Sequence, residues 1–324
     1  MAEGRPQPVL PLSQLWFFAA ILVSTFLMGS SFIAAKILIR QGFSPMPLVG
    51  WRFLVAALAT FPLVLFEKNR RRGGLWSIHI GYRDIALVAL IGLVQTACVM
   101  GLLFWAMQFI SAATAAILLF TNPIWVAVMG RIFLRESLYR GRIIGLCLGI
   151  IGVVFAIGLG SGGTESGVTW HGKAIGIASA LGAAFCWATA TIINKRARLL
   201  VGPWALNFGQ MLIGAIALLG LAYGTRAHWP GIVTWQQYGW FLWLAIPAST
   251  GSFGLWFVAL NKGGATRTSS FLFLTPLFTV ILAYSILDRP LSWSQAMGGI
   301  LIGLALWLVN TGGAAQNQHG NNTK

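Results

Sequence analysis

Charged residues are scarce in this sequence, and their scarcity argues against a soluble fold. Only 9% of the 324 residues are Asp, Glu, Lys or Arg, whereas 57% are hydrophobic. A soluble domain carries about 25% charged residues, which it needs to cover its surface. Apolar runs of about 20 residues recur along the chain, and that length crosses the hydrocarbon core of a bilayer. The composition therefore predicts an all-α integral membrane protein.

Acidic residues and histidines are fewer still, and they lie in loops or at the ends of apolar segments. A carrier driven by protons or sodium keeps an ionisable residue inside the membrane. We therefore expect facilitated diffusion or exchange, without an embedded proton- or sodium-coupling residue. An enzyme within the membrane would need such groups clustered at one depth, so we expect no enzyme. The residues concerned are Glu3, Glu67, Asp84, Glu136, Glu165, Asp288, His79, His171, His228 and His319.

Cysteine pairs and nucleotide-binding motifs are also missing. Cys98, Cys147 and Cys186 stand singly inside apolar segments, with no spacing typical of a metal site. No Walker sequence occurs, so we expect neither ATP hydrolysis nor a cofactor. The net charge of +16 does not indicate nucleic-acid binding, because the basic residues sit mostly at the ends of apolar segments. The N-terminal residues show no cleavable signal sequence.

Ten membrane spans can be placed along the chain, and the basic residues favour one orientation. With the N-terminus inside, 16 of the 22 Lys and Arg fall on the inner face and 6, including Arg52, on the outer face. This bias predicts a multi-pass protein with both termini in the cytoplasm. The expected spans are 14–38, 46–66, 84–108, 111–133, 141–159, 173–195, 203–223, 237–260, 267–287 and 294–311.

The second half of the chain repeats the first. At an offset of 153 residues, Gly101 aligns with Gly254 and Pro123 with Pro276, and several Phe, Ala and Leu positions match between them. Five spans per half mean that the second half enters the membrane from the opposite side. We therefore expect two inverted five-helix repeats, residues 1–160 and 172–311, around a central cavity. Residues 312–324 are rich in Asn, Gln and Gly and predict a disordered cytoplasmic tail.

These features resemble the drug/metabolite transporter superfamily, in its ten-helix EamA-type branch. The residues that carry the resemblance are the Gly-Ser-Ser-Phe-x-x-x-Lys end of the first span, Gly29–Lys36, and the prolines at 123 and 276. Leu134, Glu136 and Leu138 form a Leu-x-Glu-x-Leu motif, which in the second half has become Leu-Asp-Arg-Pro-Leu at 287–291. Within the branch, bacterial aromatic amino acid exporters are the group that the chain resembles most.

The resemblance implies export or exchange of small metabolites across a bacterial inner membrane. It places the cavity between the first, third, fourth, sixth, eighth and ninth spans. We expect amino acids with aromatic or hydrophobic side chains, because hydroxyl and amide groups can bind the charged ends and deep aromatic residues the side chain. Lipophilic drugs, nucleobases or nucleotide sugars are the alternative solutes.

Polar and aromatic residues in the middle of these spans are the candidate binding site, since an unpaired polar group in hydrocarbon is costly. A buried Ser or Thr often bonds only to its own helix. Gln and Asn are harder to satisfy within one helix, and most of the 15 tryptophans are explained by the membrane interface. The candidate solute-binding residues are Ser31, Gln95, Trp105, Asn122, Trp187, Thr250, Trp256, Phe273 and Thr275.

Pro123 and Pro276 are candidate hinges. Each removes a backbone donor and crowds the preceding turn, so each predicts a kink. The freed carbonyls near Leu119 and Leu272 could bind a substrate ammonium group or be capped by Asn122 and Thr275. Kinked packing without motion is the alternative.

Glycine pairs in the fifth and tenth spans, Gly145–Gly149 and Gly299–Gly303, predict close helix packing. They would join the two halves, or two protomers, so a monomer and a homodimer both remain open.

Overall fold

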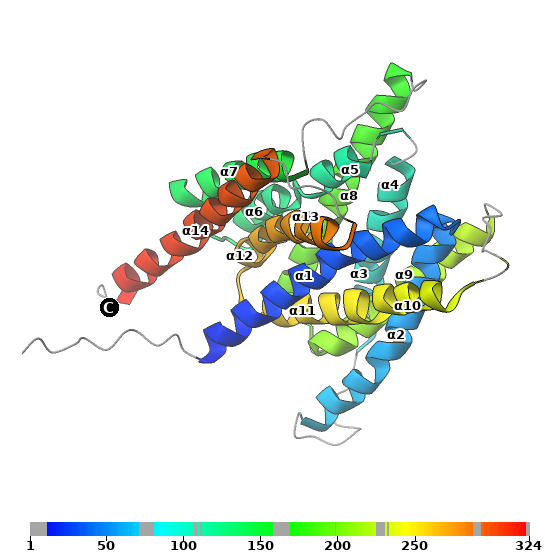
Figure 1. Cartoon of the computed structure of the whole chain (residues 1–324). Helices are drawn as coiled ribbons and strands as arrows, with labels where there is room; N and C mark the ends of the chain where they lie inside the picture. The colour runs from blue at the N-terminus through cyan, green and yellow to red at the C-terminus, as the bar shows by residue number, and fades with distance from the viewer. Residues whose placement is uncertain are drawn as a thin grey trace, which may run out of the picture.

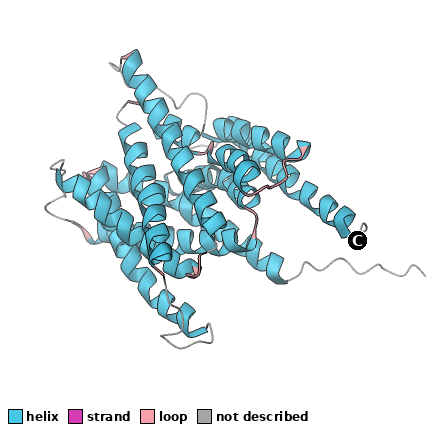
Figure 2. Cartoon of the chain, turned by 180° about the vertical axis from the view of Figure 1, so that it is seen from behind, coloured by secondary structure: helices cyan, strands magenta, loops and turns pink. Residues whose placement is uncertain are grey.

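The computed structural model describes residues 12–70, 81–106, 109–110, 112–157, 169–197, 199–224, 231, 233–287 and 293–321. Over these residues all regular structure is helical, as Figure 2 shows. The helices of the first half are α1 (Leu12–Arg40), α2 (Pro45–Arg70), α3 (Tyr82–Ile91), η1 (Gly92–Cys98), α4 (Val99–Ala106), α5 (Ala112–Leu119), α6 (Asn122–Phe133) and α7 (Arg140–Ile157). Those of the second half are α8 (Trp170–Ala197), α9 (Pro203–Gly224), α10 (Trp235–Ala245), η2 (Ile246–Gly251), α11 (Ser252–Lys262), α12 (Ala265–Ser270), η3 (Phe271–Phe273), α13 (Leu274–Leu287) and α14 (Trp293–Asn321).

Long apolar helices dominate the fold and confirm the membrane class. Within the described residues, 7 helices are long and apolar enough to cross a membrane. Two shorter apolar helices add to them, Ile117–Phe133 and Ala296–Val309. The ten-span arrangement stays a prediction. The long helices are Gln14–Arg40, Pro45–Glu67, Tyr82–Ala106, Trp170–Ala197, Pro203–Gly224, Trp235–Lys262 and Ala265–Ile286.

The C-terminal helix runs further than the composition predicts. α14 continues as far as Asn321 and so covers most of residues 312–324, for which we predicted disorder. The division into residues 1–160 and 172–311 has no direct test in the structure.

Several helices change their winding midway, and they do so at matching places in the two halves. η1 and η2 are π-helical, and the offset of 153 residues brings Cys98 onto Gly251. Before Pro123 the helix is interrupted at 120–121, and before Pro276 it tightens into the 3₁₀ turn η3. The missing proline N–H and its ring explain both proline interruptions. The helices are thus interrupted where the prolines predict it, whereas the hinge role stays a prediction.

The helices pack in pairs that mirror each other between the halves (Figure 1). α1 contacts α11 and α13, while α8, its counterpart in the second half, contacts α4 and α6. α2 lies against α9, and α7 lies along α14 at one end of the molecule. Swapping the two halves would leave this pattern of helix contacts unchanged. It brings the middles of α1, α6, α8 and α11 together around one hydrophobic core.

A glycine of the motif at the end of the first span allows one of these close contacts. A Cβ atom on Gly29 would lie 2.9 Å from both the Cβ of Phe278 and the carbonyl oxygen of Thr275 in α13. Only glycine therefore lets α1 approach α13 at this distance. Thr279 completes the contact by donating to the carbonyl oxygen of Gly29 at 3.1 Å.

Two carboxylates of the first half cap helices of the second half. Glu136, in the loop after α6, accepts from the backbone N–H groups of Ala265 at 2.6 Å and Thr266 at 3.1 Å, at the start of α12. Glu67 likewise accepts from Trp204 and Ala205 at the start of α9. A carboxylate near a helix N-terminus satisfies free N–H groups and complements the helix dipole. The acidic residue of the Leu-x-Glu-x-Leu motif therefore joins the two halves; its counterpart at 288 lies outside the described residues.

Removal of the Glu136 cap is expected to lower stability. The change Glu136→Ala leaves two N–H groups of α12 without their acceptor, and we expect a loss of about 1–2 kcal/mol. Thermal melting of the detergent-solubilised protein measures it. Glu136→Gln is the matched control: its single amide oxygen can accept from only one of the two N–H groups, so it should recover part of the stability. Equal melting temperatures for wild type and Glu136→Ala would contradict the role.

Candidate functional site

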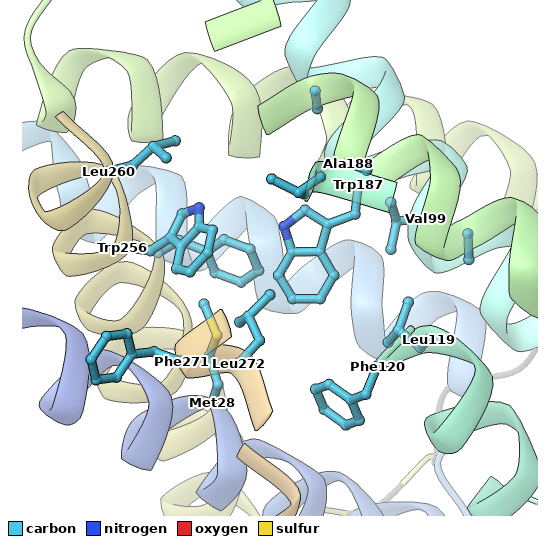
Figure 3. Packing of buried hydrophobic residues seen from close by; sticks show 14 of the residues in the cluster. Met28, Val99, Leu119, Phe120, Trp187, Ala188, Trp256, Leu260, Phe271 and Leu272 are labelled. Carbon is cyan, nitrogen blue, oxygen red and sulfur yellow. The ribbon is translucent and has the colours of Figure 1, made fainter. Parts of the chain in front are cut away.

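Two tryptophans from different helices of the second half meet in the core. Trp187 of α8 and Trp256 of α11 have ring centroids 6.3 Å apart at an angle of 62°. Trp256 is fully buried and Trp187 is 6% exposed. Figure 3 shows the two indoles next to each other, with Met28, Phe120 and Phe271 nearby. The aromatic rings come from α8, α11 and the segments before the two prolines, and α1 contributes Met28.

Both indole N–H groups of this pair are buried without a hydrogen-bond partner among the described residues. A buried donor that stays unpaired costs about 1–3 kcal/mol, so such groups are rare in folded proteins. Two of them on tryptophans that meet edge to face form a place where a ligand acceptor would be stabilised. Packing of the two rings alone does not explain why neither N–H has an acceptor.

Amide side chains near the same helices carry further unpaired atoms. Gln95 lies in η1, is 2% exposed, and neither its Oε1 nor its Nε2 has a partner. Asn122 begins α6; its Nδ2 donates to the carbonyl oxygen of Ala184 at 3.1 Å, which ties α6 to α8 one turn before Trp187, while its Oδ1 stays unpaired. In α13 the hydroxyl of Thr275 is also buried and unpaired. The core thus offers both donors and acceptors.

The other candidate residues are placed differently. Ser31 donates to Met28 in its own helix at 2.7 Å, and Thr250 donates to the carbonyl oxygen of Ala56 at 2.7 Å, so both hydroxyls are occupied. Phe273 is fully buried in η3. Trp105 is 50% exposed and packs on Phe109, on a different face of α4 from its buried residues. We therefore leave Trp105 out of the proposed site.

A small polar cavity lies two helical turns from the tryptophan pair. Its volume is about 210 Å³, less than the 300–1,000 Å³ typical of drug-sized ligands. Asn194 and Lys195 reach it from the C-terminal end of α8, and Asn261 reaches it from that of α11. These are the helices that carry Trp187 and Trp256, so the cavity is a candidate vestibule for a small solute. Its remaining lining residues are Leu199, Val201, Pro203 and Leu206.

Arg52 corrects the sequence interpretation. We expected it at the outer interface, yet it is only 7% exposed, and its Nε donates to the Ser249 hydroxyl at 2.6 Å. Its Nη2 lies 3.4 Å from the carbonyl oxygen of Ala248, in the same π-helical segment. Its position inside the predicted span 46–66 was the signal that could have revealed its burial. The core is therefore not devoid of charge.

Comparison with known proteins agrees with this architecture. The profile of the EamA-like transporter family matches residues 15–158 and again residues 174–311. The chain belongs to the EamA-like transporter family. The two matched segments together cover most of the sequence; the first contains η1 and α6, and the second contains both Trp187 and Trp256.

Relatives of this chain include proteins that are named as transporters. It is 27% identical over 280 residues to the uncharacterized transporter YvbV of Bacillus subtilis, covering 83% of this chain and 89% of the relative. It is also 27% identical over 327 residues to a WAT1-related chloroplastic protein, At3g02690, of Arabidopsis thaliana, covering 95% and 73%. A crystal structure of a protein with 16% identity superposes with a TM-score of 0.74 over 92% of this chain and 96% of the other, which supports the fold alone. The chain is therefore a multi-pass membrane protein of a transporter family.

Proposed function

We propose that this protein exports or exchanges amino acids with aromatic or hydrophobic side chains. The observation that carries the proposal is the buried pair Trp187–Trp256 with two unpaired indole N–H groups. A solute carboxylate would accept from these donors, and a solute ammonium would donate to the free oxygens of Gln95 and Asn122. The solute side chain would pack on the indole faces. Lipophilic drugs, nucleobases and nucleotide sugars remain alternative solutes, but an uncharged drug would leave the polar atoms unpaired.

Alternating access of two inverted five-helix halves is the mechanism that we propose. The mirrored packing and the matching π-helical segments support it, since transporters built this way place the site between the repeats. In this arrangement the protein lies in a bacterial inner membrane with both termini in the cytoplasm, as a monomer or homodimer. The orientation can be tested with a reporter enzyme that is active only outside the cytoplasm, fused after residue 324. Activity of this fusion in intact cells would overturn the orientation.

Transport without proton or sodium coupling is the second part of the proposal. Among the described residues, Glu67, Asp84 and Glu136 lie in helix end turns or the adjoining loop rather than in the middle of a membrane helix. The solute gradient would then drive the flux. Uphill accumulation under an imposed pH gradient in proteoliposomes would contradict this.

Counterflow in proteoliposomes tests the function itself. Vesicles that contain only the purified protein are preloaded with unlabelled phenylalanine, tyrosine, tryptophan, leucine, alanine or uridine, and entry of the labelled solute is followed. We expect the aromatic amino acids to exchange fastest and uridine not to exchange. Equal rates for all solutes, or no flux above empty vesicles for any of them, would overturn the proposal.

The change Gln95→Leu is expected to separate function from stability. Leucine removes an amide whose two polar atoms are unpaired in the core, so stability should rise by about 1–2 kcal/mol. The half-saturation concentration for counterflow should rise on the order of 10-fold, because the solute ammonium loses an acceptor. Melting temperature and counterflow measure the two effects. A variant with unchanged affinity would place Gln95 outside the site.

A further inference from the structure

Two π-helical segments, η1 and η2, occupy matching positions in the two halves. π-helical turns are rare and occur frequently at functional sites. At the offset of 153 residues, Gln95 aligns with Ala248 and Thr96 with Ser249. Each segment therefore carries a buried hydroxyl at the same place, and in η1 the neighbouring residue is the unpaired Gln95.

Each hydroxyl is held by a long polar side chain from the opposite half. In one contact the Thr96 hydroxyl donates to Oε1 of Gln210 in α9. In the other, Arg52 of α2 donates through Nε to the Ser249 hydroxyl at 2.6 Å. All four side chains are buried, with exposures between 0% and 7%.

Arg52 and Gln210 are themselves counterparts. Aligning Pro45, which begins α2, with Pro203, which begins α9, places Leu48 on Leu206 and Arg52 on Gln210. The two contacts thus join equivalent positions, once in each direction across the halves, although the hydroxyl donates in one and accepts in the other. α9 packs against η1 and α2 packs against η2, as these contacts require.

The Gln210 contact continues into a buried chain of hydrogen bonds. Its Nε2 donates to Oδ1 of Asn207 at 3.2 Å, and Nδ2 of Asn207 donates to the carbonyl oxygen of Thr250 in η2 at 3.2 Å. One polar chain therefore links η1, α9 and η2. The orientation of each π-helical turn depends on the other half of the molecule.

We propose that Gln210 and Arg52 are positioning residues that hold the two π-helical segments in the shape that binds solute. Through Thr96, Gln210 holds η1 and so sets the direction of the adjacent Gln95 amide. Arg52 holds η2 through the Ser249 hydroxyl. This inference rests on the proposed function, because it assigns these residues a role in solute affinity. Neither side chain needs to touch the solute.

The pair Thr96 and Gln210 allows a sharp test by counterflow with labelled phenylalanine. Thr96→Val keeps the side-chain shape but loses the hydroxyl, and we expect the half-saturation concentration to rise on the order of 10-fold. Thr96→Ser keeps the hydroxyl and should restore affinity. Gln210→Leu also removes the bond to Asn207, so it should weaken affinity at least as much as Thr96→Val. The double variant Thr96→Val/Gln210→Leu should match Gln210→Leu, because the contact with Thr96 is already lost in that variant. In the other half, Ser249→Ala should weaken affinity and Ser249→Thr should keep it.

Thr25→Val is the matched control for a lost buried hydroxyl. Thr25 is fully buried and donates to the carbonyl oxygen of Ile21 in its own helix at 2.9 Å, so its removal should leave affinity within about twofold. Wild-type affinity in Thr96→Val, with wild-type flux present, would overturn the inference. A fall in maximal rate and melting temperature without a change in half-saturation would also overturn it, since it would show a purely structural role. Absence of flux in the wild type would instead count against the proposed function.

Discussion

Alanine at both Trp187 and Trp256 is expected to lower counterflow at low solute concentration on the order of 1,000-fold. Buried aromatic anchors each cost about 2 kcal/mol or more when truncated at a binding surface, and 1.4 kcal/mol is a factor of ten. Here the solute would lose two indole faces and two donors at once. Initial rates in proteoliposomes of equal protein content measure the effect. Melting curves must accompany them, because truncating a core tryptophan also destabilises the fold.

Phenylalanine at the same two positions separates the contribution of the aromatic ring to affinity from that of the indole N–H donor. It keeps an apolar ring but removes the N–H, so affinity for amino acids should fall while the protein stays folded. Trp105→Ala is the matched tryptophan control, because that residue is half exposed and lies apart from the pair. Retained affinity in the doubly substituted phenylalanine variant would remove the indole donors from the mechanism. A loss of affinity in Trp105→Ala would return that residue to the site.

Leucine in place of Gly145 is expected to destabilise the protein by about 3 kcal/mol or more. A Cβ atom there would lie 2.8 Å from both the carbonyl oxygen of Ala305 and a methyl group of Val309 in α14. Since α7 and α14 lie along each other, the added side chain would force the two helices apart. Thermal melting and the yield of monodisperse protein in detergent measure the loss.

Gly303→Leu is the control in the partner helix, since nothing lies within 4 Å of a Cβ atom at that position. Its free energy of unfolding should lie within about 0.5 kcal/mol of the wild-type value. Equal destabilisation by the two substitutions would contradict the packing role of Gly145. The glycine pattern thus predicts close packing correctly for Gly145, where the contact joins the two halves within one chain. It does not do so for Gly303, whose surroundings are open.

Long apolar helices could be predicted from composition because the bilayer imposes one requirement on every spanning segment. The prolines likewise predict interruptions, and the structure places one before Pro123 and one before Pro276. The π-helical winding of η1 could not be predicted, because its sequence contains no proline and no glycine pair that would mark a departure from an ordinary helix. It becomes understandable only with the Thr96–Gln210 contact in view.

Candidate site residues could be chosen by type but not by partner. Gln95, Asn122, Trp187, Trp256 and Thr275 were chosen because polar groups in hydrocarbon need a reason, and each has an unpaired buried atom. The hydroxyls of Ser31 and Thr250 met the same criterion and are occupied by backbone carbonyls. Ser31 bonds within its own helix, whereas Thr250 bonds to α2, and only the structure shows which of these outcomes applies.

The sequence by itself determined that this is a membrane protein, that it is all helical, that its halves resemble each other and that it belongs to a transporter family. Each of these follows from local composition or from repeated motifs. Only the tertiary structure decided that Arg52 is buried against η2, that Glu136 caps α12, and that Trp187 and Trp256 meet. These contacts join residues more than 60 positions apart, so they arise from how helices pack. Helical periodicity leaves that packing undetermined, because nearly every face of these helices is apolar.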